Sequence, residues 1–363
     1  AGGDPNKIVD YAGDGSVMIS GNNLVNALIF GSDYLGYPIY TTPNGENVIG
    51  MDGKINPNAK IGSVYGDYYV TPDDWEKELF DNSNLRQEYN VSISGSSDKM
   101  TYYMSAGYLD DSGIIPGSGY SRLSTRLKAD YKVQEWLKVG ANMAYTYFNA
   151  NSLSEDGSSA SSGNVFAIST RIAPIYPMYI RDGEGNIMID KNGYKMYDYG
   201  DGENGGLGRP FMSGSNAYSA TMLNENNAEG NAINAMGFAE LRFLKDFKFT
   251  WTSSVNVDET RSTAFTNPYY GQYASQNGML YKYHTRNLAY NHQQLLNWKR
   301  SFGSHNLDVM LGHESYRYKY YYLYASKSNM FDPTNHELAG AITENGNNSY
   351  TTDYNTEGYF GRV

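Results

Sequence analysis

Residues 137–147 read LKVGANMAYTY, and apolar and polar side chains alternate along the whole segment. One face carries the odd-numbered residues, which are all apolar or aromatic, and the other carries Lys138, Asn142 and Thr146. A period of two is typical of a β-strand with one apolar and one wet face. Strands of soluble domains usually have about 5–6 residues, whereas a tilted strand needs about 9–11 to cross a bilayer. The segment therefore predicts a strand that spans a membrane.

The same alternation recurs before and after this segment. An apolar outer face and a wet inner face are what a lipid-embedded barrel requires. The sequence thus predicts an all-β fold, an antiparallel transmembrane β-barrel of which this chain supplies about eight to nine strands. The expected strands cover residues 86–95, 99–109, 120–133, 137–148, 236–244, 246–258, 279–300 and 305–324, with the start of a ninth at 354–363.

The connections between these strands alternate in length. Short turns follow the first, third, fifth and seventh strands, whereas longer segments follow the others. Outer-membrane barrels have short periplasmic turns and longer extracellular loops, so we expect the long connections outside the cell. In the eighth strand the apolar residues change parity between Leu311 and Tyr316, which predicts a β-bulge near Gly312.

Two long irregular segments complete the chain. Residues 1–84 are rich in turn-forming residues and are expected to be an extracellular loop region. Short helices are predicted around 22–29 and 72–79, the second with Thr71 as its N-cap and Pro72 in its first turn.

The remainder, residues 85–363, is expected to be the N-terminal portion of the barrel. A large extracellular loop interrupts it at 149–235. This loop is predicted to hold a helix at 164–172 and a hairpin at 179–189. Its apolar residues indicate that it folds against other parts of the protein.

Composition narrows the class of protein. Tyrosine occurs 36 times in 363 residues, an excess that fits aromatic girdles at two membrane interfaces. The net charge of −11 argues against a nucleic-acid surface, and the absence of cysteine excludes disulfides and thiolate metal sites. The sequence contains no run of about 18 apolar residues, so no membrane helix is expected. The first ten residues lack a signal-peptide pattern, so we expect a cleaved signal or a piece of a longer chain.

Motifs for catalysis or metal binding are weak. His313-Glu314 lacks the second histidine of a metalloprotease and falls on an expected strand. Residues 182–186, DGEGN, resemble a calcium loop superficially, but its glycine is misplaced and its bidentate glutamate is missing, which favours a hairpin turn. Asn90-Val91-Ser92 matches a glycosylation triplet inside a strand. We therefore predict no enzyme, no cofactor, no catalytic residue and no metal ligand, and no individual ligand-binding residue is identified.

A row of charged residues alternates with the apolar residues of these strands and therefore lies on the opposite face of the sheet. Buried charge is costly unless it is paired, so these side chains are expected to line a wide, wet lumen or to face a separate plug domain. The row consists of Arg122, Arg126, Lys128, Asp130 and Lys138.

An ordered series of segments resembles the SusC/RagA-type family of TonB-dependent outer-membrane transporters. The series covers residues 85–363, which makes the resemblance specific, although no single motif decides it. The matching segments are LRQEYNVSISG at 85–95, KMTYY at 99–103, GYLDDSG at 107–113, WLKVGAN at 136–142, APIYP at 173–177, DG at 182–183, LGHE at 311–314 and FGRV at 360–363.

This resemblance implies a barrel of about 22 strands around an N-terminal plug. It implies a location in the cell outer membrane of a Gram-negative, Bacteroidetes-like bacterium, in contact with membrane lipid. It also implies TonB-driven import of oligosaccharides or peptides, with a SusD-like surface lipoprotein as a lid, and it leaves open a homodimer of the complex. The plug, the TonB box and the carboxy-terminal strand are expected outside this chain.

Two other architectures are compatible with the strand pattern. A soluble or cell-surface β-rich carbohydrate-binding module or adhesin would close an apolar core between two sheets. A small barrel of about eight to ten strands would close on itself.

Overall fold

The computed structural model describes residues 8–10, 18–20, 37–43, 46–49, 53–153, 165–209, 212–271 and 273–363. The chain divides into two compact units. The sheet unit comprises residues 82–153, 225–268 and 275–363, and the loop unit comprises residues 1–81, 154–224 and 269–274.

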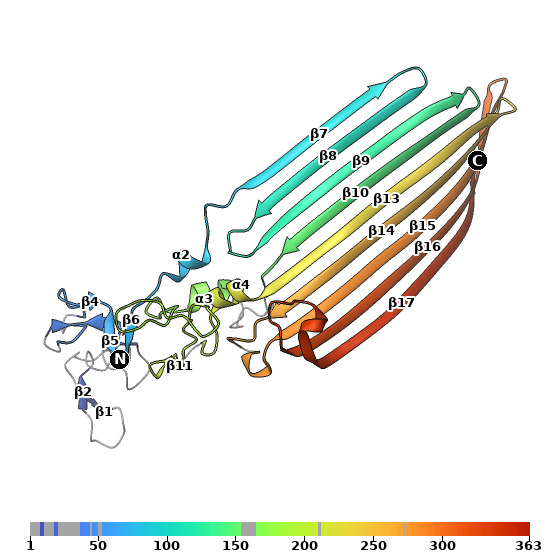
Figure 1. The fold of residues 1–363 in the computed structure, drawn as a ribbon. Helices are drawn as coiled ribbons and strands as arrows, with labels where there is room; N and C mark the ends of the chain where they lie inside the picture. The colour runs from blue at the N-terminus through green and yellow to red at the C-terminus, as the bar shows by residue number, and fades with distance from the viewer. Residues whose placement is uncertain are drawn as a thin grey trace. The chain divides into compact units, whose positions relative to one another are not determined.

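Nine antiparallel strands form one sheet in the sheet unit (Figure 1). Each strand pairs with its neighbours in chain order, and the strands lengthen from 11 residues in β7 to 26 in β16. The strands are β7 (Arg86–Ser96), β8 (Met100–Ser112), β9 (Gly119–Gln134), β10 (Leu137–Asn151), β13 (Glu225–Phe243), β14 (Phe247–Thr266), β15 (Met279–Phe302), β16 (His305–Met330) and β17 (Ala341–Arg362). The predicted all-β, antiparallel fold is confirmed.

The predicted alternation of connections is also present. The turns that follow β7, β9, β13 and β15 are short, and we call their side of the sheet the turn end. The connections after β8, β10, β14 and β16 span residues 113–118, 152–224, 267–278 and 331–340. We call the opposite side the loop end.

Several strands extend further toward the loop end than predicted. β13 begins at Glu225 instead of residue 236, β16 continues to Met330 instead of 324, and β17 begins at Ala341 instead of 354. The extensions were missed because polar residues there occupy both faces, so pairing continues without apolar alternation. Because β10 also continues to Asn151, the connection from β10 to β13 spans 152–224 and not 149–235.

Cross-strand pairing places the predicted apolar residues on one face, which we call the outer face. Leu127 lies opposite Met143, Val139 opposite Ala239, and Val257 opposite Leu288. The side chains remain accessible: Leu127 is 41% and Trp251 is 47% exposed. All other sheets among the described residues have two strands, so none forms the second layer that a sandwich core requires.

The sheet is also open. β7 and β17 are its two edges, and they do not pair with each other in the described part of the chain. This arrangement differs from the small self-closed barrel. Together with the exposed outer face, it agrees with a portion of a larger barrel.

Aromatic residues border the outer face at the turn end. The rings of Phe243 and Phe247 stack with centroids 5.5 Å apart, Phe247 lies 6.3 Å from Trp298, and Trp298 lies 6.3 Å from Phe302. Such a row is typical of the aromatic girdle at a membrane interface. Phenylalanine and tryptophan build it here, and many of the tyrosines lie elsewhere.

The predicted bulge near Gly312 is wrong. β16 pairs with β15 without a register shift, and its pairing with β17 shifts only between Ser326 and Lys327. Gly312 instead lies opposite Phe360, whose ring occupies the space where a Cβ atom would stand. The parity change is therefore real, and the even-numbered tyrosines from Tyr316 to Tyr324 face the opposite side from Leu311.

The loop unit contains small elements. They are β1 (Ile8–Asp10), β2 (Met18–Ser20), β3 (Tyr40–Thr41), β4 (Lys60–Ile61), β5 (Ser63–Tyr65), β6 (Tyr68–Val70), α2 (Trp75–Leu79), α3 (Val165–Arg171), β11 (Asp201–Asn204), β12 (Leu207–Gly208) and α4 (Ala217–Leu223). Two 3-10 turns lie at Ala274–Gln276, where the two units meet in sequence, and at Leu338–Gly340 in the sheet unit. The predicted helix at 164–172 is confirmed as α3, whereas residues 22–29 lie outside the described residues. No described helix is long and apolar enough to cross a membrane.

Helix α2 begins at Trp75, three residues after Pro72, which was the predicted first residue of the helix. Its N-cap is Asp74, which accepts a hydrogen bond from the Lys77 amide at 3.1 Å, and not Thr71. Asp73 is drawn away from the helix because it binds Arg181 and accepts from the Met178 amide. The predicted hairpin is present: Arg181 bridges to Ile187 across the DGEGN turn.

Apolar side chains of the loop unit pack against one another, as its composition indicates. Met178 and Ile180 are buried, together with Val70 and Leu79 from the first part of the chain. The indole nitrogen of Trp75 donates to the Tyr176 carbonyl at 2.9 Å. Residues about 100 positions apart thus form one small core.

Candidate lumen-facing surface

The inner face of the sheet carries the predicted row of charges. Arg126 lies opposite Ala144, Lys128 opposite Asn142, and Asp130 opposite Gly140, all with the parity opposite to the outer face. The Arg126 guanidinium donates to Asn142 Oδ1 at 3.2 Å. The structure therefore brings these residues together on one polar wall.

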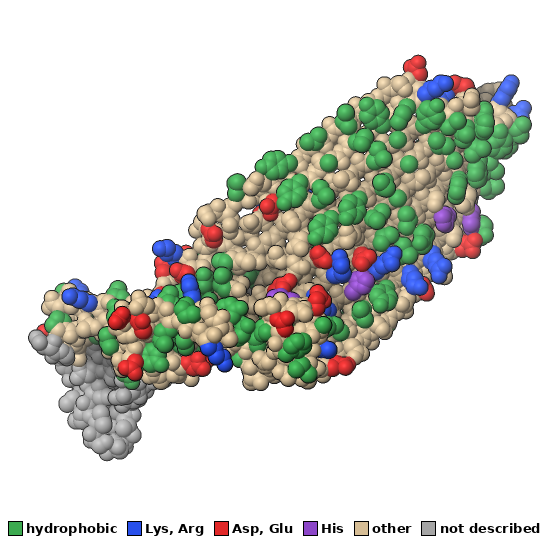
Figure 2. All heavy atoms as spheres, viewed as in Figure 1, with side chains coloured by type: hydrophobic (Ala, Val, Ile, Leu, Met, Phe, Trp, Pro, Cys, Tyr) green, Lys and Arg blue, Asp and Glu red, His purple; other side chains and the backbone are tan. Residues whose placement is uncertain are grey.

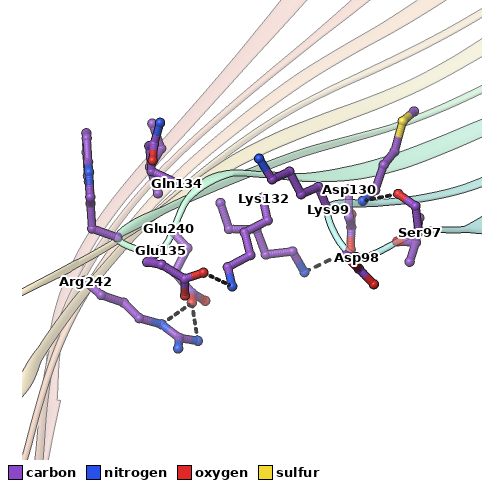
Figure 3. A pocket seen from close by; sticks show the side chains of 14 residues that line it. Ser97, Asp98, Lys99, Asp130, Lys132, Gln134, Glu135, Glu240 and Arg242 are labelled. Atoms are coloured by element: carbon purple, nitrogen blue, oxygen red, sulfur yellow. Dashed lines mark hydrogen bonds and ion pairs between the residues drawn. The ribbon is translucent and has the colours of Figure 1, made fainter.

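A pocket of about 350 Å³ lies at the turn end of this wall (Figure 3). Basic and acidic side chains alternate around it and bind one another. Lys132 contacts Glu135 at 2.7 Å, and Arg242 contacts Glu240 at 2.9 Å (Figure 3). Lys138 and Asp130 form a further pair at 3.1 Å. Because the charges are largely satisfied within the sheet, this pocket fixes the turns and offers few free groups to a ligand.

The loop end of the same face carries a different surface, built from tyrosines on three neighbouring strands. Direct pairing places Tyr324 opposite Tyr283, Tyr322 opposite Tyr350, and Tyr318 opposite Tyr354. We call the whole set the tyrosine ladder. It consists of Tyr281 and Tyr283 on β15, Tyr316, Tyr318, Tyr320, Tyr322 and Tyr324 on β16, and Tyr350 and Tyr354 on β17.

Rings of the ladder contact one another across the strands. The centroids of Tyr283 and Tyr324 are 5.0 Å apart, and those of Tyr322 and Tyr350 are 5.1 Å apart. The Tyr318 hydroxyl donates to Asn287 Oδ1 at 2.5 Å. These contacts join neighbouring rings into one continuous surface.

The position of the ladder follows from the other face of β16. An unbroken apolar run there ends at Leu311, and the outer residues His313, Ser315, Arg317 and Lys319 follow it before Tyr321 and Leu323. Since Tyr316 to Tyr324 come after this run, the ladder lies toward the loop end. Its rings therefore lie on the inner face where the outer residues of the wall are of mixed polarity.

The ladder combines flat apolar rings with hydroxyl groups. Tyrosine suits contacts with one apolar and one wet side, because its ring packs while its hydroxyl hydrogen-bonds. Tyr350 and Tyr354 are 48% and 57% exposed, which leaves ring surface available to a ligand. Sequence reasoning missed this surface because the expected bulge assigned these residues to the outer face. Their unbroken parity was the signal that could have revealed it.

The loop unit has an aromatic cluster of its own, arranged around a buried carboxylate. Asp198 accepts hydrogen bonds from the Tyr37 hydroxyl at 3.1 Å and from Asn204 Nδ2 at 2.6 Å. Burial raises the pKa of Asp198, and the hydrogen bonds only partly oppose this effect. Burial also raises the pKa of Tyr197 to about 12. The cluster is consequently a packed core rather than an open binding site.

The weak motifs have structural roles. His313 and Glu314 point to opposite faces: His313 contacts Glu357 at 2.9 Å, and Glu314 accepts from Asn291 at 2.8 Å. Asp182 caps its own hairpin by accepting from the amides of Glu184 and Asn186. No group of three or more metal-ligating side chains occurs among the residues that the structure describes.

Comparison with known proteins gives consistent matches. The chain is 26% identical to the TonB-dependent receptor SusC of Bacteroides thetaiotaomicron over 252 residues, which are 66% of this chain and 24% of SusC. It is 22% identical to the TonB-dependent receptor P3 of Formosa agariphila over 263 residues, which are 70% of this chain and 24% of P3. No protein-family model matches the sequence.

The fold matches a solved structure, that of the RagAB peptide importer in the closed-closed state. The TM-score is 0.64 at 24% sequence identity, and the match covers 82% of this chain and 32% of that chain. This chain thus spans about a quarter to a third of the proteins that it matches. These relatives are TonB-dependent receptors and a peptide importer. Sequence and fold agree that the chain resembles TonB-dependent receptors of the SusC/RagA type and matches part of their barrel.

Proposed function

We propose that this chain forms part of the wall of an importer that takes up oligosaccharides or peptides across the outer membrane. The observation that carries this proposal is the division of the sheet into two faces. The outer face is apolar, and the inner face holds charged side chains at the turn end and the tyrosine ladder at the loop end. Such a wall separates lipid from a water-filled lumen.

Both cargo classes fit the ladder. Tyrosine rings stack on the apolar faces of sugars, and they also pack against peptide side chains while their hydroxyls bind polar groups. The matched RagAB structure is that of a peptide importer, which supports a peptide cargo. The ladder would guide the cargo at the loop end, before it reaches the charged part of the wall.

Two partners complete the proposal. Residues 1–84 and the connection 152–224 would lie outside the cell, where a SusD-like lipoprotein would cover them as a lid. The RagAB complex, to which the fold is similar, supports a two-component arrangement of this kind. TonB would supply energy through parts of the polypeptide that lie outside this chain.

Uptake by the complete receptor in its host cell tests the proposal. Tyr318, Tyr320 and Tyr322 are changed together to Ala, and uptake of labelled peptides and of labelled oligosaccharides is measured. We expect an apparent affinity for the true cargo class that is roughly 100-fold weaker, because three aromatic contacts worth about 1 kcal/mol each are removed. The matched control changes Tyr89 and Tyr108, which lie opposite each other on the outer face, and should leave the affinity unchanged.

Energy dependence gives an independent test. Uptake should stop when the TonB protein is deleted or the proton gradient is collapsed, while surface binding of the cargo persists. Binding of a glycan without any uptake in wild-type cells would contradict the proposal and favour a surface adhesin.

A further inference from the structure

A second pocket, of about 370 Å³, lies on the outer face at the loop end of the sheet, and we call it the outer pocket. Its floor consists of two rows of side chains that cross the four neighbouring strands β13 to β16. These rows continue the outer face beyond Val257, on the side of the sheet opposite to the tyrosine ladder. One row is Asn227, Thr263, Lys282 and Ala325, and the other is Glu229, Arg261, His284 and Leu323.

The connection from β16 to β17, residues 331–340, forms one wall of the outer pocket, and we call it the strap (Figure 1). The His336 ring of the strap stacks on Phe265 with centroids 3.9 Å apart, and its Nδ1 contacts Glu225 on β13. Leu338 packs against a buried apolar cluster that includes Phe265. The strap thus reaches from β16 across to β13, and the pocket lies between it and the sheet.

The charged side chains that line the outer pocket pair with one another. Arg261 contacts Glu229 at 3.0 Å, and Lys282 contacts Glu337 of the strap at 2.9 Å. Figure 2 shows acidic, basic and histidine side chains mixed in this way on the visible face of the sheet. Two cations thus meet two carboxylates, and the lining carries no excess of either charge.

The rows on either side of the pocket are balanced as well. On the same four strands they add two acids, Glu225 and Glu259, and two cations, Arg286 and Lys327. Glu259 contacts His284 at 3.0 Å and lies opposite Arg286. Neither a free anion nor a free cation is therefore favoured as the ligand of the pocket.

Polar groups of the outer pocket keep hydrogen-bonding capacity after these pairs have formed. The Lys282 ammonium has three donors, and it gives one to Thr263 Oγ1 and one to Glu337, each at 2.9 Å. Its third donor and the Thr263 hydroxyl proton have no partner among the described residues. The Asn227 amide donates to two asparagines of β10, at 3.0 Å and 2.7 Å, and its carbonyl oxygen is left as an acceptor. Donors and acceptors thus stand side by side on groups that are neutral or paired.

An apolar edge lies next to these polar groups. It is formed by Leu323, Ala325 and Leu338, and Leu323 is 40% exposed. A sugar ring has the matching chemistry, because its hydroxyls both donate and accept whereas its C–H groups are apolar. The volume also falls in the range of about 300–1,000 Å³ that is typical of small-ligand pockets.

We propose that the outer pocket binds a neutral saccharide of one or two rings. Lys282 and Arg261 would donate to its hydroxyls, Asn227 would accept from one of them, and Leu323 with Leu338 would contact the C–H groups. The sugar would come either from a free saccharide or from the saccharide part of a membrane glycolipid. The pocket is separate from the cargo path on the inner face, so its occupation does not depend on the proposed import.

Saccharide binding to the complete receptor tests the outer pocket. The receptor is reconstituted in phosphatidylcholine nanodiscs, since many detergents carry sugar headgroups. Maltose, cellobiose and N-acetylglucosamine are titrated, and dissociation constants are measured by saturation-transfer NMR. The receptor in which Tyr318, Tyr320 and Tyr322 are changed to Ala serves as the background, so that the tyrosine ladder contributes little to the signal.

The background receptor should bind at least one of these sugars with a millimolar dissociation constant. That constant should change little when salt is raised from roughly 50 to 500 mM, because the ligand is uncharged. No binding of any of the three sugars would overturn the proposal. Uptake is not measured, so failure of the proposed import function would leave this result unaffected.

Two variants in the same background locate the bound sugar. Ala325→Trp fills the pocket without removing a polar group and should abolish binding. Thr263→Val removes one hydroxyl with little change of shape and should weaken binding about fivefold, as expected for one neutral hydrogen bond. Ala239→Trp and Thr351→Val alter the same residue types on the outer face outside the pocket, and should leave the affinity unchanged. Equal binding with and without Ala325→Trp would overturn the proposal.

Charged probes test the class of ligand. Inorganic phosphate and phosphorylethanolamine at millimolar concentration should not displace the sugar, because the charges of the pocket are already paired. Displacement by either probe would overturn the assignment to a neutral saccharide.

Octyl maltoside below its micelle-forming concentration distinguishes the two sources of the sugar. Binding that is roughly tenfold tighter than that of maltose, and lost in Ala325→Trp, assigns the pocket to the sugar of a membrane lipid. Equal affinity of the two probes assigns it to a free saccharide.

Discussion

Gly312 on β16 lies directly opposite Phe360 on β17, and the Phe360 ring lies over the glycine. Gly140 and Phe238 form the same arrangement between β10 and β13. In both pairs the ring occupies the space that a Cβ atom would need. An aromatic ring that covers a glycine restores side-chain packing where a strand would otherwise be weak.

Gly312→Ala should therefore destabilise the sheet. The new methyl group would overlap the Phe360 ring and force it to move, which costs about 1–3 kcal/mol in well-packed regions. Urea unfolding of the complete receptor in lipid vesicles measures this loss. Gly358→Ala on β17 is the matched control, because nothing lies within 4 Å of its Cβ position. That change should be neutral or stabilising by up to about 1 kcal/mol.

Arginine scanning distinguishes the two faces of the sheet. Leu127→Arg or Val139→Arg places a charge on the outer face, where it should cost about 2–4 kcal/mol near the bilayer midplane. Thr146→Arg adds the same side chain to the inner face of β10 and should cost much less. Refolding free energies in vesicles provide the comparison. Equal costs on both faces would show that the outer face does not contact lipid.

A largely buried ion pair joins two segments of the loop unit. Arg181 contacts Asp73 at 2.5 Å and 3.0 Å through its two terminal nitrogens, and each side chain is only 12% exposed. Asp73→Ala would leave the Arg181 charge without its partner, at a cost of about 3–5 kcal/mol. Hydrogen exchange should accelerate at the Met178 and Tyr179 amides, which donate to Asp73.

The double variant Asp73→Leu with Arg181→Met provides the control for this pair. Two apolar side chains of similar size leave no unpaired charge, so much of the stability should return. Exchange at the Met178 amide should nevertheless stay fast, since its acceptor is absent. If the double variant were as unstable as Asp73→Ala, the geometry of the site and not its charge would decide the stability.

The sequence was sufficient for some features of the fold and insufficient for others. Leu137 to Tyr147 lie between lipid and lumen, so their alternation reports both the strand and its faces. The start of β13 at Glu225 carries no such contrast, because polar residues occupy both of its faces. The Asp74 cap was missed because the choice between Asp73 and Asp74 depends on Arg181, more than 100 residues away. The tyrosine ladder was missed because the apolar and aromatic residues of β16 were all expected on the outer face. Beyond Gly312 most of its tyrosines instead lie on the inner face.

The buried carboxylate of Asp198 should make the stability of the loop unit depend on pH. Because burial raises its pKa, the folded unit holds this proton more firmly than the unfolded chain does. The stability that this proton contributes is complete below the ordinary aspartate pKa of about 4. It is lost as pH rises through the raised pKa of the folded state. Asp198→Asn removes the titrating group, so the variant should not lose this stability as pH rises. From pH 4 to pH 8 the wild type should therefore become increasingly less resistant to protease than the variant.

Asp182 provides a control of opposite sign for this pH dependence. Hydrogen bonds from the Asn186 side chain and amide hold the pKa of Asp182 below its usual range. Its contribution is therefore present above about pH 4 and is lost as pH falls through the lowered value. Asp182→Asn should make the hairpin more sensitive to protease at pH 7 and change little at low pH. If both variants shifted the profile in one direction, burial of Asp198 would not be the cause, because only the buried group gains stability from its proton.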